Sequence, residues 1–176
     1  MSLYNGFARN IILPLGDMVM GRTVLKRLKF LEKSQWWSQN KLIAYQNKKL
    51  RKLIKHVYVN VPYYNELFKK RGLLPTDIQT IDDLNKLPIL TKEDIRNNFP
   101  DRIVARNIPR RKLLHFASSG STGEPLRYYK TPESYSYRIA CNLRGWYWMD
   151  YKLGDKFVKL SQNPRQTANK KIQDLE

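Results

Sequence analysis

The sequence contains a single cysteine, Cys141, and no long uninterrupted hydrophobic run. One cysteine excludes an internal disulfide bond and a cysteine-rich zinc site, so we expect a reducing, cytoplasmic location. The most apolar stretch, residues 10–20, is interrupted by Pro14 and Asp17. It is shorter than the roughly 20 apolar residues that span a bilayer, and it has no clear small-residue cleavage site. Neither a membrane-spanning segment nor a signal peptide is therefore expected here.

Acidic residues are also scarce, since 15 Asp and Glu stand against 33 Lys and Arg and give a net charge of +18. Residues 1–60 carry most of the excess, with 12 basic and 2 acidic side chains. Such a charge favours anionic partners, which include nucleotides, nucleic acid, acidic lipids and proteins. With Arg22, Lys26 and Lys29 nearby, residues 10–20 have the composition of a helix that makes peripheral contact with an acidic membrane. The alternative, favoured on generic grounds, is a helix that docks on the rest of the protein.

A chain of 176 residues with 41% hydrophobic residues is large enough for one ordinary domain. Apolar side chains recur every three or four positions and predict helices over residues 18–32 and 34–58, with Ser34 as N-cap of the second. Pro62 favours the start of a short helix, and residues 77–90 have the pattern of short helical turns. Thr91 has the position of an N-cap for a brief helix that ends near Asn98.

The pattern changes after residue 112, where compact apolar segments predict strands. Residues 113–117 are typical of a buried strand, and residues 126–130 and 156–160 are further candidates. Thr131, Pro132 and Glu133 have the order N-cap, first helical proline and acidic first turn, so we expect a long helix from there to about Met149. The sequence thus predicts an α/β protein with a mainly helical region, 1–110, followed by a partial α/β segment, 111–176.

The segment between the first two predicted strands is rich in hydroxyls and glycine. It reads Ser118, Ser119, Gly120, Ser121, Thr122, Gly123, Glu124, Pro125. Small residues bring backbone amides close to a ligand, the hydroxyls add hydrogen bonds, and both features suit the phosphates of ATP. The glycine spacing and the missing Gly-Lys-Ser/Thr exclude a Walker-type loop. Composition alone leaves a solvent-exposed Ser/Gly linker as an equal alternative.

Three segments together resemble a known family. They are Asn60-Val61-Pro62-Tyr63-Tyr64, residues 83–92, and the loop 118–125. The loop is similar to the phosphate loop of the adenylate-forming superfamily. The wider pattern, from about residue 34 onward, is similar to the amino-terminal part of the phenylacetate-coenzyme A ligase-like family, which includes capsular polysaccharide biosynthesis proteins.

The resemblance implies an AMP-forming ligase chemistry for the full-length family. A carboxylate and ATP with Mg²⁺ give an acyl-adenylate and pyrophosphate, and a thiol such as coenzyme A then attacks the adenylate. The loop residues would hold the ATP phosphates; they are Ser118, Ser119, Gly120, Ser121, Thr122, Gly123 and Pro125. The resemblance leaves the role of Arg127 open.

Later elements of the family have no counterpart in this sequence. They are an aromatic-Gly-x-Thr-Glu segment, a ribose-binding aspartate, and a carboxyl-terminal domain with a catalytic lysine. We therefore expect a truncated or split ligase-like protein that is inactive alone, and we assign no catalytic residue and no metal ligand. A sheet with few strands would leave open edges and apolar faces, which favours self-association.

Other residues have two interpretations each. His115 precedes the loop and is either near the ligand or, as favoured, a structural residue of a buried strand. Aromatic residues of the long helix, among them Tyr135, Tyr147 and Trp148, either form the core or line an acyl pocket. Basic residues around Trp36 and Trp37 favour a solvated helix face over a nucleic-acid site, because no nucleic-acid motif accompanies them. The alternative function is thus a non-catalytic basic helical module for an acidic membrane, a protein or nucleic acid.

Overall fold

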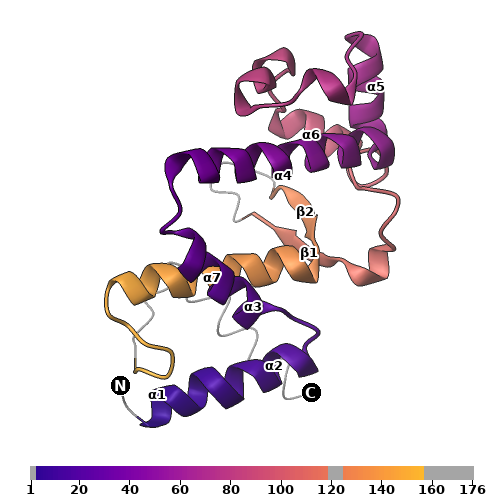
Figure 1. Cartoon of the computed structure of the whole chain (residues 1–176). Coiled ribbons are helices and arrows are strands. Elements are labelled where there is room, and N and C mark those ends of the chain that lie inside the picture. The colour runs from indigo at the N-terminus through magenta and orange to yellow at the C-terminus, as the bar shows by residue number, and fades with distance from the viewer. Residues whose placement is uncertain (1–2, 119–124, 157–176) are drawn as a thin grey trace, which may run out of the picture.

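The computed structural model describes residues 3–118 and 125–156 (Figure 1). The chain begins with one helical run made of α1 (Leu3–Phe7), a π-helical turn (Ala8–Ile12) and α2 (Leu13–Val19). The run ends at a turn in which Gly21 has a φ of 57°. The predicted helix 18–32 is therefore wrong at its start, because Met18 and Val19 belong to α2 and the next helix begins at Val24.

Two helices far apart in the sequence form the first core. Helix α3 (Val24–Ser34) packs against α7 (Pro132–Trp148), and Val24, Leu28, Ala140 and Leu143 are buried between them. Two hydrogen bonds fix the start of α3: the Thr23 amide donates to Ser136 Oγ (3.2 Å) and the Leu25 amide to Asp17 Oδ2 (2.8 Å). These contacts bring the beginning and the end of the described chain together.

The predicted start of α7 is confirmed. Thr131 is the N-cap, its hydroxyl oxygen accepts a hydrogen bond from the Ser134 amide (3.1 Å), and Pro132 is the first helical residue. Glu133 in the first turn pairs with Arg27 of α3. Glu133, one of the three residues that indicate the helix in the sequence, therefore also links it to α3.

A second core lies between α4 (Gln39–Asn60) and α5 (Pro62–Lys70), where Ile54, Phe68 and Ile78 are buried. The prediction of Ser34 as N-cap is wrong, since Ser34 ends α3 and Ser38 precedes α4. Trp37 packs edge-on against Phe30 (5.7 Å between ring centroids) and Tyr45 (5.6 Å). Because this aromatic cluster forms at the bend, the chain turns before α4 can begin.

Short turns lead from α5 to the strands. They are 3₁₀ helices at Pro75–Asp77, Ile81–Lys86 and Arg110–Lys112, with α6 (Lys92–Asn98) between the second and third. The short turns predicted for residues 77–90 and the helix from Thr91 to Asn98 are confirmed.

The strands β1 (Leu114–Ala117) and β2 (Arg127–Lys130) form an antiparallel pair in which Leu114 faces Lys130 and Ala117 faces Arg127. The two predicted strands are confirmed, and with the preceding helices they give the predicted α/β class. The expectation of a buried first strand is wrong, because His115 and Ala117 are exposed. An isolated pair of strands has one solvated face, so exposure alternates along β1. The third strand candidate lies outside the described residues, except for Lys156.

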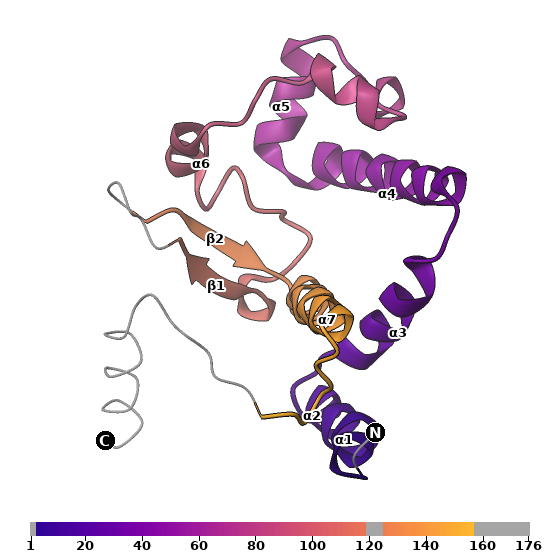
Figure 2. The ribbon, with the colours of Figure 1, turned by 90° about the vertical axis from the view of Figure 1, so that its left-hand side faces the viewer.

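The hairpin lies between the group α4–α6 and the helical run α1–α2 in both ribbon views (Figure 2). The division into segments 1–110 and 111–176 stays a prediction, and α7 of the second segment packs on α3 of the first. Within residues 3–118 and 125–156, no helix has the length and apolar character needed to cross a membrane.

The α3–α7 core gives a first test of the fold. Leu28 is completely buried, so Leu28→Ala leaves a cavity and is expected to lower the free energy of unfolding by about 2–5 kcal/mol. The matched control is Leu53→Ala, because Leu53 is 55% exposed on α4. Urea denaturation followed by circular dichroism checks both variants. Equal losses would contradict the assignment of Leu28 to the core.

Candidate functional site

The candidate loop is closed at its base by two hydrogen bonds just beyond the last strand pair. The Ser118 amide donates to the Leu126 carbonyl (2.9 Å), and the Leu126 amide donates to Ser118 Oγ (2.8 Å). The Ser118 hydroxyl oxygen is thus an acceptor at the base, and its own hydrogen can still be donated. Residues 119–124 of the predicted loop lie outside the described residues. The hairpin therefore fixes where this segment begins and ends.

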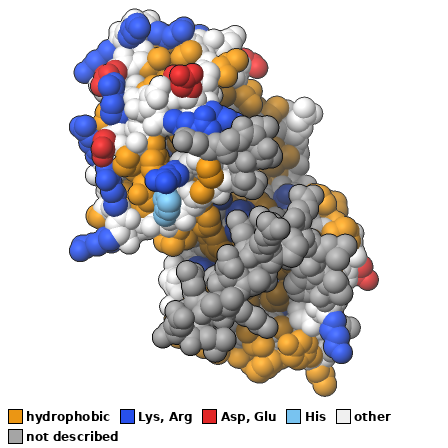
Figure 3. Space-filling view, turned by 180° about the vertical axis from the view of Figure 1, so that it is seen from behind, with side chains coloured by type: hydrophobic (Ala, Val, Ile, Leu, Met, Phe, Trp, Pro, Cys, Tyr) orange, Lys and Arg blue, Asp and Glu red, His pale blue; other side chains and the backbone are white. Residues whose placement is uncertain are grey.

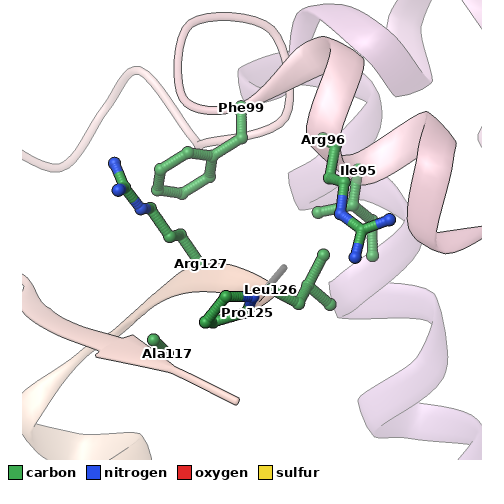
Figure 4. Close-up of a pocket in the computed structure, with 7 residues that line it drawn as sticks. All are labelled: Ile95, Arg96, Phe99, Ala117, Pro125, Leu126 and Arg127. Atoms are coloured by element: carbon green, nitrogen blue, oxygen red, sulfur yellow. The ribbon is translucent and has the colours of Figure 1, made fainter. Parts of the chain in front are cut away.

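A pocket of about 540 Å³ opens beside the base of the loop (Figure 4). One side is the hairpin and the other is α6 with the residue that follows it. The lining residues are Ala117, Pro125, Leu126 and Arg127 of the hairpin side and Ile95, Arg96 and Phe99 of the α6 side. The loop thus leaves the hairpin at the rim of a concave surface.

Among the described residues that line the pocket, two carry positive charge and none is a carboxylate. Arg96 comes from α6 and Arg127 from β2, and their guanidinium groups lie on opposite sides of the pocket, with that of Arg127 beside the Phe99 ring (Figure 4). Guanidinium groups donate paired hydrogen bonds to phosphate oxygens and keep their charge at all physiological pH values. The described part of the pocket therefore fits an anionic ligand.

Helix α6 is positioned by a capping box. The Asp94 amide donates to Thr91 Oγ1 (3.0 Å), and the Thr91 amide donates to Asp94 Oδ2 (2.9 Å). The Thr91 hydroxyl also donates to Asp94 Oδ2 (2.6 Å). The hydrogen bonds from Thr91 hold the pKa of Asp94 below its ordinary value. The bond from the side chain has the larger effect, and the bond from the backbone amide has the smaller one. The cap fixes the helix that carries Arg96.

Aromatic stacking joins the end of α6 to the hairpin. Phe99 stacks on Tyr129 of β2, with ring centroids 5.3 Å apart and an interplanar angle of 25°. His115 of β1 lies 5.4 Å from the same tyrosine ring. Offset stacking of this kind stabilises a pair by roughly 0.5–1.5 kcal/mol beyond its buried area. The two walls of the pocket are therefore held together by side chains next to it.

The structure brings together only part of the predicted site. Ser118 lies at the base of the loop and Pro125 lines the pocket. Ser119, Gly120, Ser121, Thr122 and Gly123 lie outside the described residues, so their phosphate contacts stay a prediction. Sequence reasoning missed Arg96, since no local motif marks it and it is about 30 positions from Arg127.

His115 and the aromatic residues of α7 do not form a pocket. His115 is exposed and packs on Tyr129, so its interpretation as a residue of a buried strand is wrong. Tyr147 packs against the α3–α7 core, Tyr135 stacks on Phe116, and Trp148 is 67% exposed. Because these rings face different neighbours, the less favoured alternative of an acyl pocket on α7 finds no support.

Residues 3–118 and 125–156 contain no group of three or more His, Cys, Asp or Glu side chains that could hold a metal ion. A divalent cation that accompanies a nucleotide would therefore have to take its ligands from phosphate oxygens, water or residues elsewhere.

Comparisons with known proteins place the chain beside CoA ligases. It is 40% identical over 96 residues to phenylacetate-coenzyme A ligase of Aromatoleum evansii, which covers 54% of this chain and 21% of that protein. The phenylacetate-coenzyme A ligase of Escherichia coli (strain K12) is 40% identical over 88 residues, 50% of this chain and 20% of the relative. No family model matches the chain.

By sequence, then, the chain is related to CoA ligases over about half of its residues. The particular relatives are the phenylacetate-coenzyme A ligases and, at 33% identity over 101 residues, protein CapK of Staphylococcus aureus. That last match covers 57% of this chain and 22% of CapK. The chain thus spans about a fifth of the length of the curated relatives it matches.

Solved structures also match the chain. One of them is 2-hydroxyisobutyryl-CoA ligase in complex with 2-HIB-AMP and CoA, with a TM-score of 0.45 and 17% identity. The match covers 53% of this chain and 21% of the ligase chain. A TM-score below 0.5 is too low to establish a common fold.

Because Asp94 takes part in the cap of α6, we expect the free energy of unfolding to depend on pH. The pKa of Asp94 is lowered from 3.8 in the folded protein, so its contribution is present above that value and is lost as the pH falls through the folded pKa. Thr91→Ala removes the hydroxyl, and we expect it to cost about 1 kcal/mol at neutral pH.

The measurement is urea denaturation of the wild type and Thr91→Ala across acidic and neutral pH. The difference between them should shrink once Asp94 is protonated, since the Thr91–Asp94 bonds then weaken. Thr76→Ala is a control threonine in a 3₁₀ turn that precedes α6. A loss for Thr91→Ala that is the same at every pH would contradict the role of Asp94.

Proposed function

We propose that residues 118–125 form the phosphate-binding loop of an AMP-forming carboxylate–CoA ligase-like protein, of which this chain is an amino-terminal part. The observation that carries the proposal is the coincidence of two independent facts. The hairpin brings Ser118 and Pro125 to the rim of a pocket lined by Arg96 and Arg127. The chain also has 40% identity to a phenylacetate-coenzyme A ligase over 96 residues.

In this proposal the loop donates hydrogen bonds to the triphosphate, and the arginines of the pocket neutralise its charge. The amides and hydroxyls of residues 119–123 would donate hydrogen bonds to the β- and γ-phosphates, and the Ser118 hydroxyl would add one from the base. Arg127 and Arg96 would neutralise the charge that grows as pyrophosphate leaves, which is mainly an electrostatic task. Mg²⁺ bound to the phosphates supplies further charge neutralisation.

The rest of the proposed reaction would need segments for which this sequence has no counterpart. A carboxylate substrate, an adenine site and an acceptor such as coenzyme A are proposed for the whole protein only, as are its cytoplasmic location and a link to capsule synthesis. The described residues orient and neutralise the phosphate end of the nucleotide. We therefore propose one wall of an ATP site that is inactive alone.

Nucleotide binding tests the site directly. Isothermal titration of the 176-residue chain with ATP and Mg²⁺ should give measurable binding, and Arg127→Gln should weaken it about tenfold through loss of a charge-assisted hydrogen bond. The matched control is Arg111→Gln, because Arg111 precedes β1 at the end of the hairpin away from the loop. Equal affinities of the two variants would overturn the assignment of Arg127.

Turnover provides a separate test. ATP–pyrophosphate exchange with a panel of carboxylates should be absent for the 176-residue chain, because it lacks counterparts of the adenine and lysine segments. Exchange above the level of a denatured-protein control would show that the chain is a complete adenylating enzyme. That result would contradict the proposal that it acts only as one wall of the site.

A further inference from the structure

The first helical run of the chain has an apolar stripe that the fold leaves uncovered. Leu3, Phe7, Ile11, Leu15 and Met18 recur every four or three residues and therefore lie on one helical face. Their exposed fractions are 95%, 50%, 45%, 52% and 72%. Orange side chains gather at the lower end of the molecule in Figure 3, the end where Figure 1 places α1 and α2. We call these five residues the apolar stripe.

The opposite face of the same run is anchored on the protein. Asn5 and Ala8 are buried, and Leu13 packs against the α3–α7 core. The Asn5 side-chain amide donates to Asp155 Oδ1 (2.6 Å), and Arg9 pairs with Glu32 of α3 (2.9 Å). The predicted docking of this helix is therefore confirmed for one face, and the anchors hold the apolar stripe outward.

Positive charge lies on α3, the helix next to the run. Residues 1–60 contain 12 basic side chains, six of which belong to α4, and their two acidic residues are Asp17 and Glu32. Asp17 accepts a hydrogen bond from the Leu25 amide and Glu32 pairs with Arg9, so both carboxylates are engaged within the protein. Lys26, Lys29 and Lys33 are exposed on α3, which packs beside α2.

We propose that the run Leu3–Val19 binds the surface of an anionic lipid bilayer, with the apolar stripe inserted at the level of the headgroups. An interfacial helix needs an outward apolar face that is fixed in orientation and positive charge close by, and both are present here. Charge complementarity selects lipid over a second copy of the chain. A second copy would bring the same basic region against this one, whereas anionic headgroups neutralise it.

Vesicle co-sedimentation of the 176-residue chain tests this proposal. The chain should bind vesicles of phosphatidylcholine mixed with phosphatidylglycerol, and it should bind pure phosphatidylcholine far less. Binding should weaken as salt rises, because screening shortens the reach of the surface charges. Equal binding to both vesicle types, or none to either, would overturn the proposal.

Matched variants distinguish lipid binding by the apolar stripe from non-specific binding by other exposed apolar side chains. Phe7→Gln with Leu15→Gln keeps good helix formers and should lower the partition coefficient about tenfold. The control is Val59→Gln with Ile89→Gln, since these side chains are 66% and 90% exposed away from the stripe. It should bind like the wild type. An equal loss in the two double variants would contradict a role specific to the stripe.

Two further measurements test whether the stripe binds lipid. Met18→Gln alters the far end of the stripe and should also weaken binding, while circular dichroism should show an unchanged fold because all the altered residues are exposed. Sedimentation velocity without lipid tests whether a second copy of the chain covers the stripe instead. A dimer that Phe7→Gln with Leu15→Gln dissociates, in a chain that does not bind vesicles, would assign the stripe to a second copy and overturn the proposal.

Discussion

The packing of α7 on α3 is the constraint on which the rest of the structure depends. Helix α7 follows directly after β2, so burial of Ala140 and Leu143 against Val24 and Leu28 fixes where the hairpin lies. The same packing supports α2, because Leu13 contacts this core. Roughly 1.5–3 kcal/mol for each fully buried large apolar side chain makes it a major stabilising contact of the described chain. The candidate loop and the apolar stripe both take their orientation from it.

The candidate site depends on a second, smaller set of contacts. The cap at Thr91 fixes α6, and the stack of Phe99 on Tyr129 holds α6 near the hairpin. Together they place Arg96 across the pocket from Arg127. The loop itself is closed by the hydrogen bonds between Ser118 and Leu126. A phosphate-binding function therefore requires contacts from segments that are separate in the sequence.

Local signals in the sequence predict the elements that depend on local chemistry. The cap at Thr91, the start of α7 at Thr131 and the two strands were all predictable, since each is specified by neighbouring residues. Features that depend on contacts between distant segments were not predictable from the sequence. The aromatic cluster of Trp37 moves the start of α4, and Arg96 reaches the pocket only because α6 packs beside the hairpin. His115 is exposed because the described sheet has only two strands. A short sequence pattern does not indicate how many strands pair.

The central claim is that residues 118–127 contact the phosphates of a nucleotide. Its most direct test is amide NMR of the ¹⁵N-labelled chain during titration with ATP and Mg²⁺, with AMP as the comparison ligand. The account predicts that ATP shifts the amide signals of residues 118–127 and the side-chain signals of Arg96 and Arg127, and that AMP shifts them far less. Shifts confined to exposed basic residues of α4, such as Lys48 and Lys52, or identical shifts with ATP and AMP, would contradict it.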